Sequence, residues 1–290
     1  MTAQCYLGGK VSSPGNFHNY IMLHKTLIYL FLPLSLVIFL AACGDSKKGE
    51  NVTMATHSIT AAEWQAVAKR RIVFGHQSVG ANILSGVQYL AKEAGVPLKV
   101  TESRISAKDT GITHFSIGRN GDPLSKINDF ADVIKSGLSP DIALMKLCYV
   151  DIVSSTNAKK LAQDYIASLD SLCRRFPQTV FVAVTTPLTT VQSGPKAWIK
   201  KLLGRSNGLA ENFRRQEFNN ILRSSYESKG RLFDLAKLEA EGAGNYAFDG
   251  QSVDVLNPVI TSDGGHLNDR GAQTVAAALL KFIAGQPTRS

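Results

Sequence analysis

The chain has 290 residues, 44% of them hydrophobic and 19% charged, so it can bury a sizeable core and is not a low-complexity polymer. Its formal net charge is +9 at pH 7, but the basic residues form no long run, so we interpret the charge as a mildly basic surface. No phosphate-binding loop, dinucleotide-binding motif or nucleic-acid-binding module is recognisable, and we expect no nucleic-acid partner.

The N-terminal segment is typical of secretion. His24 and Lys25 precede an apolar run from Leu27 to Leu40, and small residues then lead to Cys43. This pattern resembles a bacterial lipoprotein signal in which "LAAC" is the lipobox. The resemblance implies cleavage before Cys43 and acylation of that residue. We therefore expect a cell-envelope lipoprotein that faces the periplasm, anchored in the inner or outer membrane.

A membrane-spanning helix is the alternative for the apolar run, but the run is short and Pro33 interrupts it. Residues 1–21 do not resemble a signal, so Met22 is a candidate for the true start. The predicted organisation is an N-terminal extension and signal peptide over 1–42, the lipidated Cys43 and a flexible tether over 43–60, and one folded domain over 61–290.

From residue 61 onward, helical patterns alternate with buried-strand patterns. The predicted strands are "RIVFGH", "LKVTES", "DIALMKLC", "TVFVAVTTP" and "RLFDL". Helices are predicted over 61–70 and 79–94, from Pro123, over 157–176, in "ENFRRQEFNNILRSSYES" and in "NDRGAQTVAAALLKFIAG". Alternating strands and helices predict an α/β fold, a three-layer α/β/α sandwich with a central five-stranded parallel sheet.

Ligands bind beyond the carboxyl ends of such strands, and several polar segments are expected there. They are His76-Gln77-Ser78, Gly118 to Asp122, Tyr149-Val150-Asp151, and Asp263-Gly264-Gly265-His266.

Ser78 stands at a strand-to-helix corner, where it is either a nucleophile or the cap of the following helix. A nucleophilic serine needs a base and a carboxylate that orients the base. Asp263 and His266 supply both, three residues apart and separated by two glycines. Their position before the last helix favours the nucleophile for Ser78.

These residues resemble the SGNH hydrolases, also called GDSL-like esterases, over about residues 70–284. The resemblance implies a flavodoxin-like sheet and a catalytic triad of Ser78, Asp263 and His266. It also implies an oxyanion glycine after the second strand, which Gly121 matches best and Gly118 second best.

The chain departs from the family in two places. The first motif is Gly75-His76-Gln77-Ser78 instead of Gly-Asp-Ser, which implies a divergent branch. The third motif, "KLCYVDI", lacks the asparagine that donates to the oxyanion. Asn120 is our first candidate for a substitute donor and Gln77 the second. We expect His76, Gln77 and Asp151 to contact the substrate.

The predicted function is that of a serine esterase, which hydrolyses or transfers ester-linked acyl groups. A small-molecule ester or an O-acetylated envelope or secreted polysaccharide is the expected substrate. The alternative is a non-catalytic carbohydrate-binding or assembly lipoprotein with a degenerate fold. No metal or organic cofactor is required, and the spacing of His76, His114 and His266 does not resemble a metal site. The oligomeric state stays open.

Two further features are left with open interpretations. Cys148 and Cys173 would remain in the mature protein, and we expect separate thiols instead of a disulfide. The basic stretch "KAWIKKLLGR" is either a solvated amphipathic helix or one side of a groove for a glycan or an anionic polymer.

Overall fold

A parallel sheet of six strands forms the centre of the computed structural model, which describes residues 58–105, 107–192 and 207–287. The strands are β1 (Arg71–His76), β2 (Val100–Glu102), β3 (Gly111–Ser116), β4 (Ile142–Met145), β5 (Val180–Val184) and β6 (Leu232–Phe233). Their spatial order is β2-β3-β1-β4-β5-β6, and every pairing is parallel. The carboxyl ends of β1 and β4 are therefore neighbours near the middle of the sheet.

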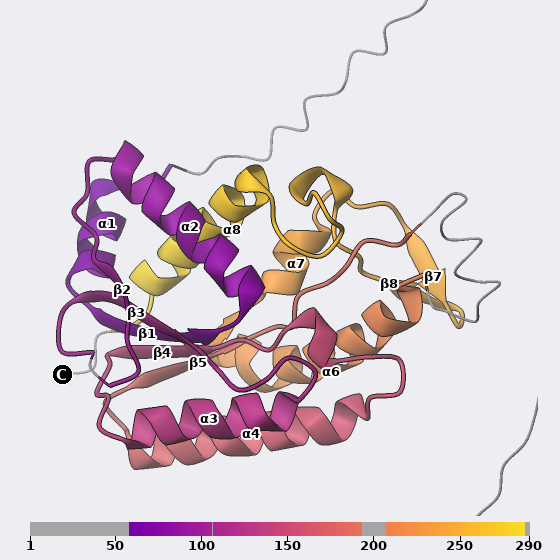
Figure 1. Cartoon of the computed structure of the whole chain (residues 1–290), viewed down its shortest axis with the longest axis horizontal. Coiled ribbons are helices and arrows are strands. Elements are labelled where there is room, and N and C mark those ends of the chain that lie inside the picture. The colour runs from indigo at the N-terminus through magenta and orange to yellow at the C-terminus, as the bar shows by residue number, and fades with distance from the viewer. Residues whose placement is uncertain (1–57, 106, 193–206, 288–290) are drawn as a thin grey trace, which may run out of the picture. The chain divides into compact units, whose positions relative to one another are not determined.

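Helices cover both faces of this sheet (Figure 1). One face carries α1 (Ala61–Ala68), α2 (Ser78–Glu93), α7 (Leu235–Ala240) and α8 (Asp269–Ala284). The other face carries α3 (Pro123–Lys135), α4 (Ala158–Arg175) and α6 (Leu209–Tyr226). The predicted three-layer α/β/α sandwich is confirmed.

The strands alternate their side chains between two apolar layers. In β1, Ile72 and Phe74 pack under α2 and α8, whereas Val73 points to the layer of α3 and α4. β5 divides its side chains in the same way, and all five of its residues are buried. Burial on both faces explains why these strands are continuous apolar runs in the sequence.

The sheet has six strands where the sequence predicted five. The additional strand is β3, whose sequence "GITHFS" is not among the predicted strands. It begins at Gly111, where φ is +112° and a Cβ would lie 2.3 Å from the Lys99 carbonyl oxygen. A glycine, two polar side chains and a close backbone approach hide this strand from a hydrophobicity pattern. The predicted strand "LKVTES" forms only the short edge strand β2.

Three smaller elements also escaped prediction. They are α7 and the antiparallel hairpin of β7 (Tyr246–Phe248) and β8 (Gln251–Val253). Short 3₁₀ turns lie at Tyr149–Asp151, Glu227–Lys229 and Pro258–Ile260. The first of these turns follows β4 and enters the candidate site.

Polar caps fix the starts of the long helices that follow the sheet edge. Asp122 accepts the Ser125 N–H ahead of α3, whose first residue is Pro123, as predicted. Asn157 caps α4 in the same way, and Asn268 caps α8 by accepting the Gly271 N–H.

Several sequence predictions lie outside the described residues, among them Cys43, most of the tether and the basic stretch over 196–205. Within the described ranges, no helix combines the length and apolar character needed to cross a membrane. Cys148 and Cys173 form no disulfide, as expected; Cys148 is buried and Cys173 half-buried.

Candidate active site

Asp263 and His266 form a hydrogen-bonded pair in the loop before α8. The Asp263 Oδ2 atom lies 2.6 Å from His266 Nδ1, while Oδ1 accepts the backbone N–H groups of Gly265 and His266 at 2.9 and 2.7 Å. These hydrogen bonds, led by that of the His266 backbone, hold the pKa of Asp263 well below its ordinary value. With Nδ1 donating to a carboxylate, neutral His266 presents Nε2 as a proton acceptor.

The loop is held in place at both ends. Gly264 has a φ of +87°, and its carbonyl accepts the Thr190 N–H at 2.9 Å. Thr261 and Leu267 form an isolated antiparallel bridge across the loop. A glycine is required at 264 because a Cβ there would lie 2.6 Å from Thr190 Oγ1 and the left-handed backbone disfavours other residues. The Asp263–His266 pair is thus positioned by backbone contacts.

Ser78 is the first residue of α2, not its cap. Gln77 occupies the N-cap position, and no side chain forms a capping hydrogen bond there. The Ser78 side chain is half-buried and makes no hydrogen bond to another residue in the described part of the chain. The cap that was the alternative interpretation of Ser78 is therefore wrong. Its hydroxyl stands at the positive end of a 16-residue helix, which favours negative charge on a bound oxygen.

Tyr149 connects the end of β4 with the histidine and was not predicted as a site residue. Its hydroxyl oxygen lies 3.5 Å from His266 Nε2, and the two rings meet edge to face at 5.7 Å between centroids. Because β1 and β4 are adjacent and parallel, the segment that carries Tyr149 and the corner that carries Ser78 lie at the same edge of the sheet. The sequence placed Tyr149 at this edge, yet its phenol resembles no residue of the expected motif.

Asp151, expected to contact the substrate, is instead fully enclosed. Its carboxylate accepts both hydrogen bonds of a buried ion pair from Lys126 Nζ, at 2.7 and 2.8 Å, and neither side chain is exposed. It also accepts the backbone N–H groups of Cys148 and Gly121. A buried carboxylate needs such partners, so Asp151 organises the loops and does not meet substrate.

The predicted oxyanion donors are partly engaged by this cluster. The Gly121 N–H donates to Asp151 Oδ1 at 2.9 Å, although the residue itself is exposed. Asn120 is exposed as well, and its Oδ1 accepts a hydrogen bond from Lys126 at 2.8 Å. Gly118, the alternative glycine, donates its N–H to Asp129. Only the amide NH₂ of Asn120 among these groups is left as a side-chain donor.

His76 and Gln77, also expected to bind substrate, face inward. His76 is 4% exposed; its Nδ1 contacts the Gln77 carbonyl and its Nε2 lies 3.1 Å from His114 Nδ1. Burial lowers the pKa of His76 to about 4, so this side chain is neutral at pH 7. The Gln77 amide donates to the carbonyls of Ile117 and Gly118, so it is not a substitute oxyanion donor. Both side chains therefore connect the end of β1 to the end of β3 and the residues that follow it.

Three further ionisable side chains are buried in the structure, and no sequence pattern predicted their burial. Lys146 is fully buried beside Cys148, and burial lowers its pKa. Glu239 is also fully buried, and burial raises its pKa to about 8. Arg215, 4% exposed, donates to the Tyr149 carbonyl and lies over the Tyr149 ring. Such burial arises from long-range packing, which single-sequence patterns do not report.

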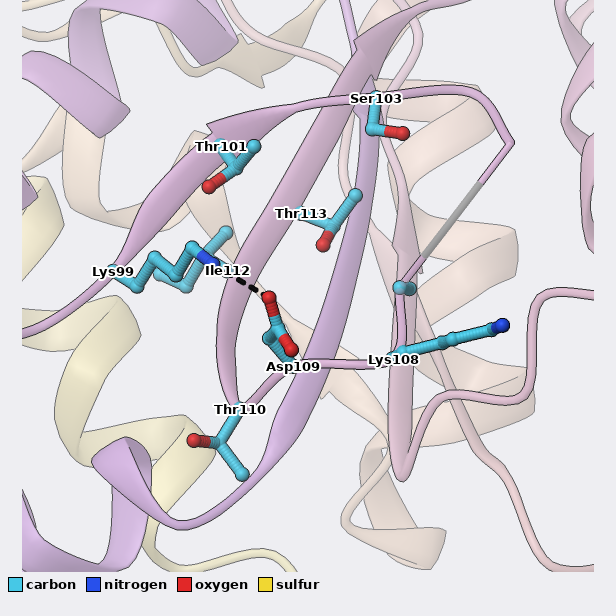
Figure 2. Close-up of a pocket in the computed structure, with 9 residues that line it drawn as sticks. Lys99, Thr101, Ser103, Lys108, Asp109, Thr110, Ile112 and Thr113 are labelled. Carbon is cyan, nitrogen blue, oxygen red and sulfur yellow. Dashed lines mark hydrogen bonds and ion pairs between the residues drawn. The ribbon is translucent and has the colours of Figure 1, made fainter.

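A separate small hollow lies at the β2–β3 edge (Figure 2). It has a volume of about 120 Å³ and contains the Lys99–Asp109 ion pair, at 2.5 Å, together with several threonines. This volume is below the roughly 300–1,000 Å³ of ordinary ligand sites, and none of the predicted site residues lines the hollow. In the described ranges no group of three or more potential metal ligands occurs.

No protein-family model matches the sequence, and none of the curated proteins matches it. Solved structures do match. An acetylxylan esterase from Geobacillus stearothermophilus is 11% identical, with 76% of this chain and 95% of that chain covered and a TM-score of 0.43. A member of the lipolytic G-D-S-L family from Veillonella parvula DSM 2008 is 12% identical, covering 72% and 95%, with a TM-score of 0.43. A carbohydrate acetylesterase from Sinorhizobium meliloti is 11% identical, covering 72% and 96%, with a TM-score of 0.42.

The family resemblance is carried by features of this chain itself. Its central parallel sheet places Ser78 at the first strand-to-helix corner, and an Asp-x-x-His pair precedes the last helix. With its altered first motif and its missing asparagine, the chain resembles a divergent SGNH hydrolase.

Proposed function

We propose that this protein is a serine esterase in which Ser78, His266 and Asp263 act as a triad. The observation that carries the proposal is the Asp263–His266 pair, in which Nδ1 meets the carboxylate and Nε2, 3.5 Å from the Tyr149 hydroxyl, remains as the basic atom of the ring. No structural role competes for the Ser78 hydroxyl among the described residues, since it neither caps α2 nor bonds to a neighbour.

The reaction follows from these positions. His266 Nε2 takes the proton of Ser78 while the serine oxygen bonds to the acyl carbon of the ester. Asp263 stabilises the resulting imidazolium, and the N–H groups at the start of α2 face the oxygen that becomes negative. Collapse of the tetrahedral intermediate breaks the ester C–O bond, and His266 returns the proton to the leaving alcohol. Water or a sugar hydroxyl then resolves the acyl-enzyme by the same steps in reverse order.

An acyl group on a polymer, such as an O-acetyl group on an envelope or secreted polysaccharide, is the proposed substrate. One observation and one sequence prediction support it. The side chains of His266 and Asp263 are 37% and 56% exposed, so the pair sits on an open surface that a bulky chain can approach. The predicted lipid anchor at Cys43 would hold the domain at the cell envelope, where such polymers are found.

One observation favours the second candidate, a carbohydrate-binding or assembly protein that no longer catalyses. The Gly121 N–H, expected to hold the oxyanion, donates to Asp151 instead. Removal of one oxyanion donor typically costs about 10²–10³ in rate, so a site without a replacement donor would be slow.

Labelling with a fluorophosphonate, followed by peptide mass spectrometry, distinguishes the two candidates. An esterase should form one adduct, on Ser78, and should lose it in Ser78→Ala and His266→Ala. Ser85→Ala is the matched control, because Ser85 is an exposed serine of the same helix, and this variant should label like wild type. A folded wild-type protein that forms no adduct and cleaves no aryl acetate would leave the binding protein as the better description.

A further inference from the structure

The site lacks the usual asparagine, and the donors that could replace it are few. The Gln77 amide is bound to two carbonyls, and Asp151 carries a negative charge that Lys126 neutralises. The Gly121 N–H is directed at Asp151. A replacement donor must therefore be a hydroxyl or an amide that points into the site and is not held by a backbone carbonyl or a carboxylate.

Tyr149 provides one. Its hydroxyl lies 3.5 Å from His266 Nε2, the atom that accepts the serine proton in the proposed reaction. Because the proposed reaction brings the Ser78 hydroxyl to the same Nε2 atom, the Tyr149 hydroxyl would then lie close to the serine oxygen and to the carbonyl that it attacks. Asn120 is the other free donor, but its amide oxygen is tied to Lys126 and nothing places it against His266.

The structure also holds the Tyr149 ring firmly. Arg215 donates from Nε to the Tyr149 carbonyl at 3.0 Å, and its guanidinium carbon lies 5.8 Å from the ring centroid. On the other side, a Cβ on Gly265 would come within 2.9 Å of Tyr149 Cζ, so only glycine leaves room for the ring. Preorganised donors are the ones that stabilise a developing charge, because they need no rearrangement during the reaction.

Tyr149 is suited to donate rather than to ionise. Burial, followed by the nearby Asp263 carboxylate, raises the pKa of the phenol above its ordinary value. The hydroxyl therefore keeps its proton throughout the pH range in which a histidine base works. A neutral phenol can give this hydrogen bond to an oxyanion, whereas a carboxylate such as Asp151 cannot.

Resting on the proposed esterase activity, we propose that the Tyr149 hydroxyl is a catalytic hydrogen-bond donor to the oxyanion, replacing the side-chain amide that the site lacks. The donor set then consists of the N–H groups at the start of α2 and this phenol, which approaches from the end of β4. The two parts of this donor set follow the neighbouring strands β1 and β4.

The test is Tyr149→Phe in the full-length, detergent-solubilised protein, which removes one oxygen and retains the ring contacts. We expect kcat/KM to fall about 10²–10³-fold with p-nitrophenyl acetate, while KM changes less than about threefold. A simple alkyl boronic acid forms a tetrahedral adduct with the serine. Its inhibition constant should rise by a similar factor in Tyr149→Phe. A residue that only supported the fold would not produce this matched loss. Tyr89→Phe, an exposed tyrosine of α2, is the control and should behave as wild type.

Each other outcome identifies what is wrong. An unchanged kcat/KM in Tyr149→Phe, with Ser78 still labelled by the fluorophosphonate, would refute the role of Tyr149 and leave the esterase intact. A large loss in Asn120→Ala with none in Tyr149→Phe would transfer the role to Asn120. A loss much greater with ethyl acetate than with p-nitrophenyl acetate would show that Tyr149 acts on the leaving group. A wild-type protein that neither forms the fluorophosphonate adduct nor hydrolyses an ester would refute both proposals.

Discussion

His76 shows how burial sets the charge of one side chain beside the proposed nucleophile. The ring is 4% exposed and faces His114, and Lys146 lies near enough to oppose a second positive charge. Burial is the main cause of its pKa of about 4, against an ordinary value of 6.5. A neutral His76 can accept a hydrogen bond from His114 through Nε2 while donating from Nδ1 to the Gln77 carbonyl.

This charge state predicts a loss of stability in acid. The unfolded chain takes up a proton on His76 near pH 6.5 but the folded chain only near pH 4, so the free energy of unfolding falls as pH decreases through this window. The full effect is about 3 kcal/mol. Urea unfolding between pH 7.5 and 4 should show a steep decline in wild type and a shallower one in His76→Gln. Parallel curves would contradict the assignment of the titration to His76; His114, whose pKa is also lowered, accounts for any residual slope.

At the scale of elements, the contact between α2 and α8 sets the geometry of the proposed triad. Ser78 begins α2, and α8 begins three residues after His266. The two helices approach closely at Gly86, where a Cβ would lie 2.3 Å from the Ala272 carbonyl oxygen. The separation of the proposed nucleophile and its proposed base therefore depends on a glycine eight residues into the helix.

Gly86→Ala should accordingly affect stability and activity together. The added methyl group has no space, so we expect a loss of about 1–3 kcal/mol in the free energy of unfolding. A fall in kcat should accompany it, because α2 must shift relative to α8 and a small displacement of reacting groups is costly. Chemical denaturation and aryl acetate kinetics measure the two effects. The neighbouring exposed Ser85→Ala is the control; a Gly86→Ala protein as stable and active as this control would disprove the tight contact.

The sequence predicted the elements that have strong patterns. Continuous apolar runs predicted β1, β4 and β5, and Pro123 marked the start of α3. β3 was missed because Gly111, Thr113 and His114 interrupt its apolar character. β6 lies within the predicted strand "RLFDL", whereas the short helix α7 was missed because it depends on packing against longer elements, which local patterns do not record.

The residues of the candidate site also fall into those that a local pattern predicted and those that it did not. The spacing of Asp263 and His266 predicted a pair, and the structure shows them hydrogen-bonded. The assignment of Asp151 to substrate contact was wrong, because its partner Lys126 lies 25 residues earlier and no local pattern indicates that a lysine will be buried. The sequence placed Tyr149 at the sheet edge but did not predict its role, since that role comes from contacts with Arg215 and His266 on other segments.

For the whole molecule, the proposed lipobox makes an independent prediction about location. Full-length protein produced in a bacterium should partition with the membrane fraction and incorporate radiolabelled palmitate, because acylation of Cys43 adds buried hydrocarbon. Cys43→Ser should abolish both, while the folded domain keeps the wild-type level of the proposed esterase activity. Cys173→Ser is the matched control, as this thiol lies within α4. Palmitate incorporation that persists in Cys43→Ser would refute the anchor.

The Asp151 carboxylate has a consequence for how this protein can change. It ties together α3 through Lys126, the β3–α3 loop through Gly121 and the end of β4 through Cys148. Substitution of Lys126 or Asp151 alone would leave a buried charge without its partner, so tolerated variants at these two positions should arise in compensating pairs. The loop that carries Asp263 is exposed and is held by hydrogen bonds to its own backbone. New substrate preferences should therefore be easier to evolve, or to engineer, along this loop.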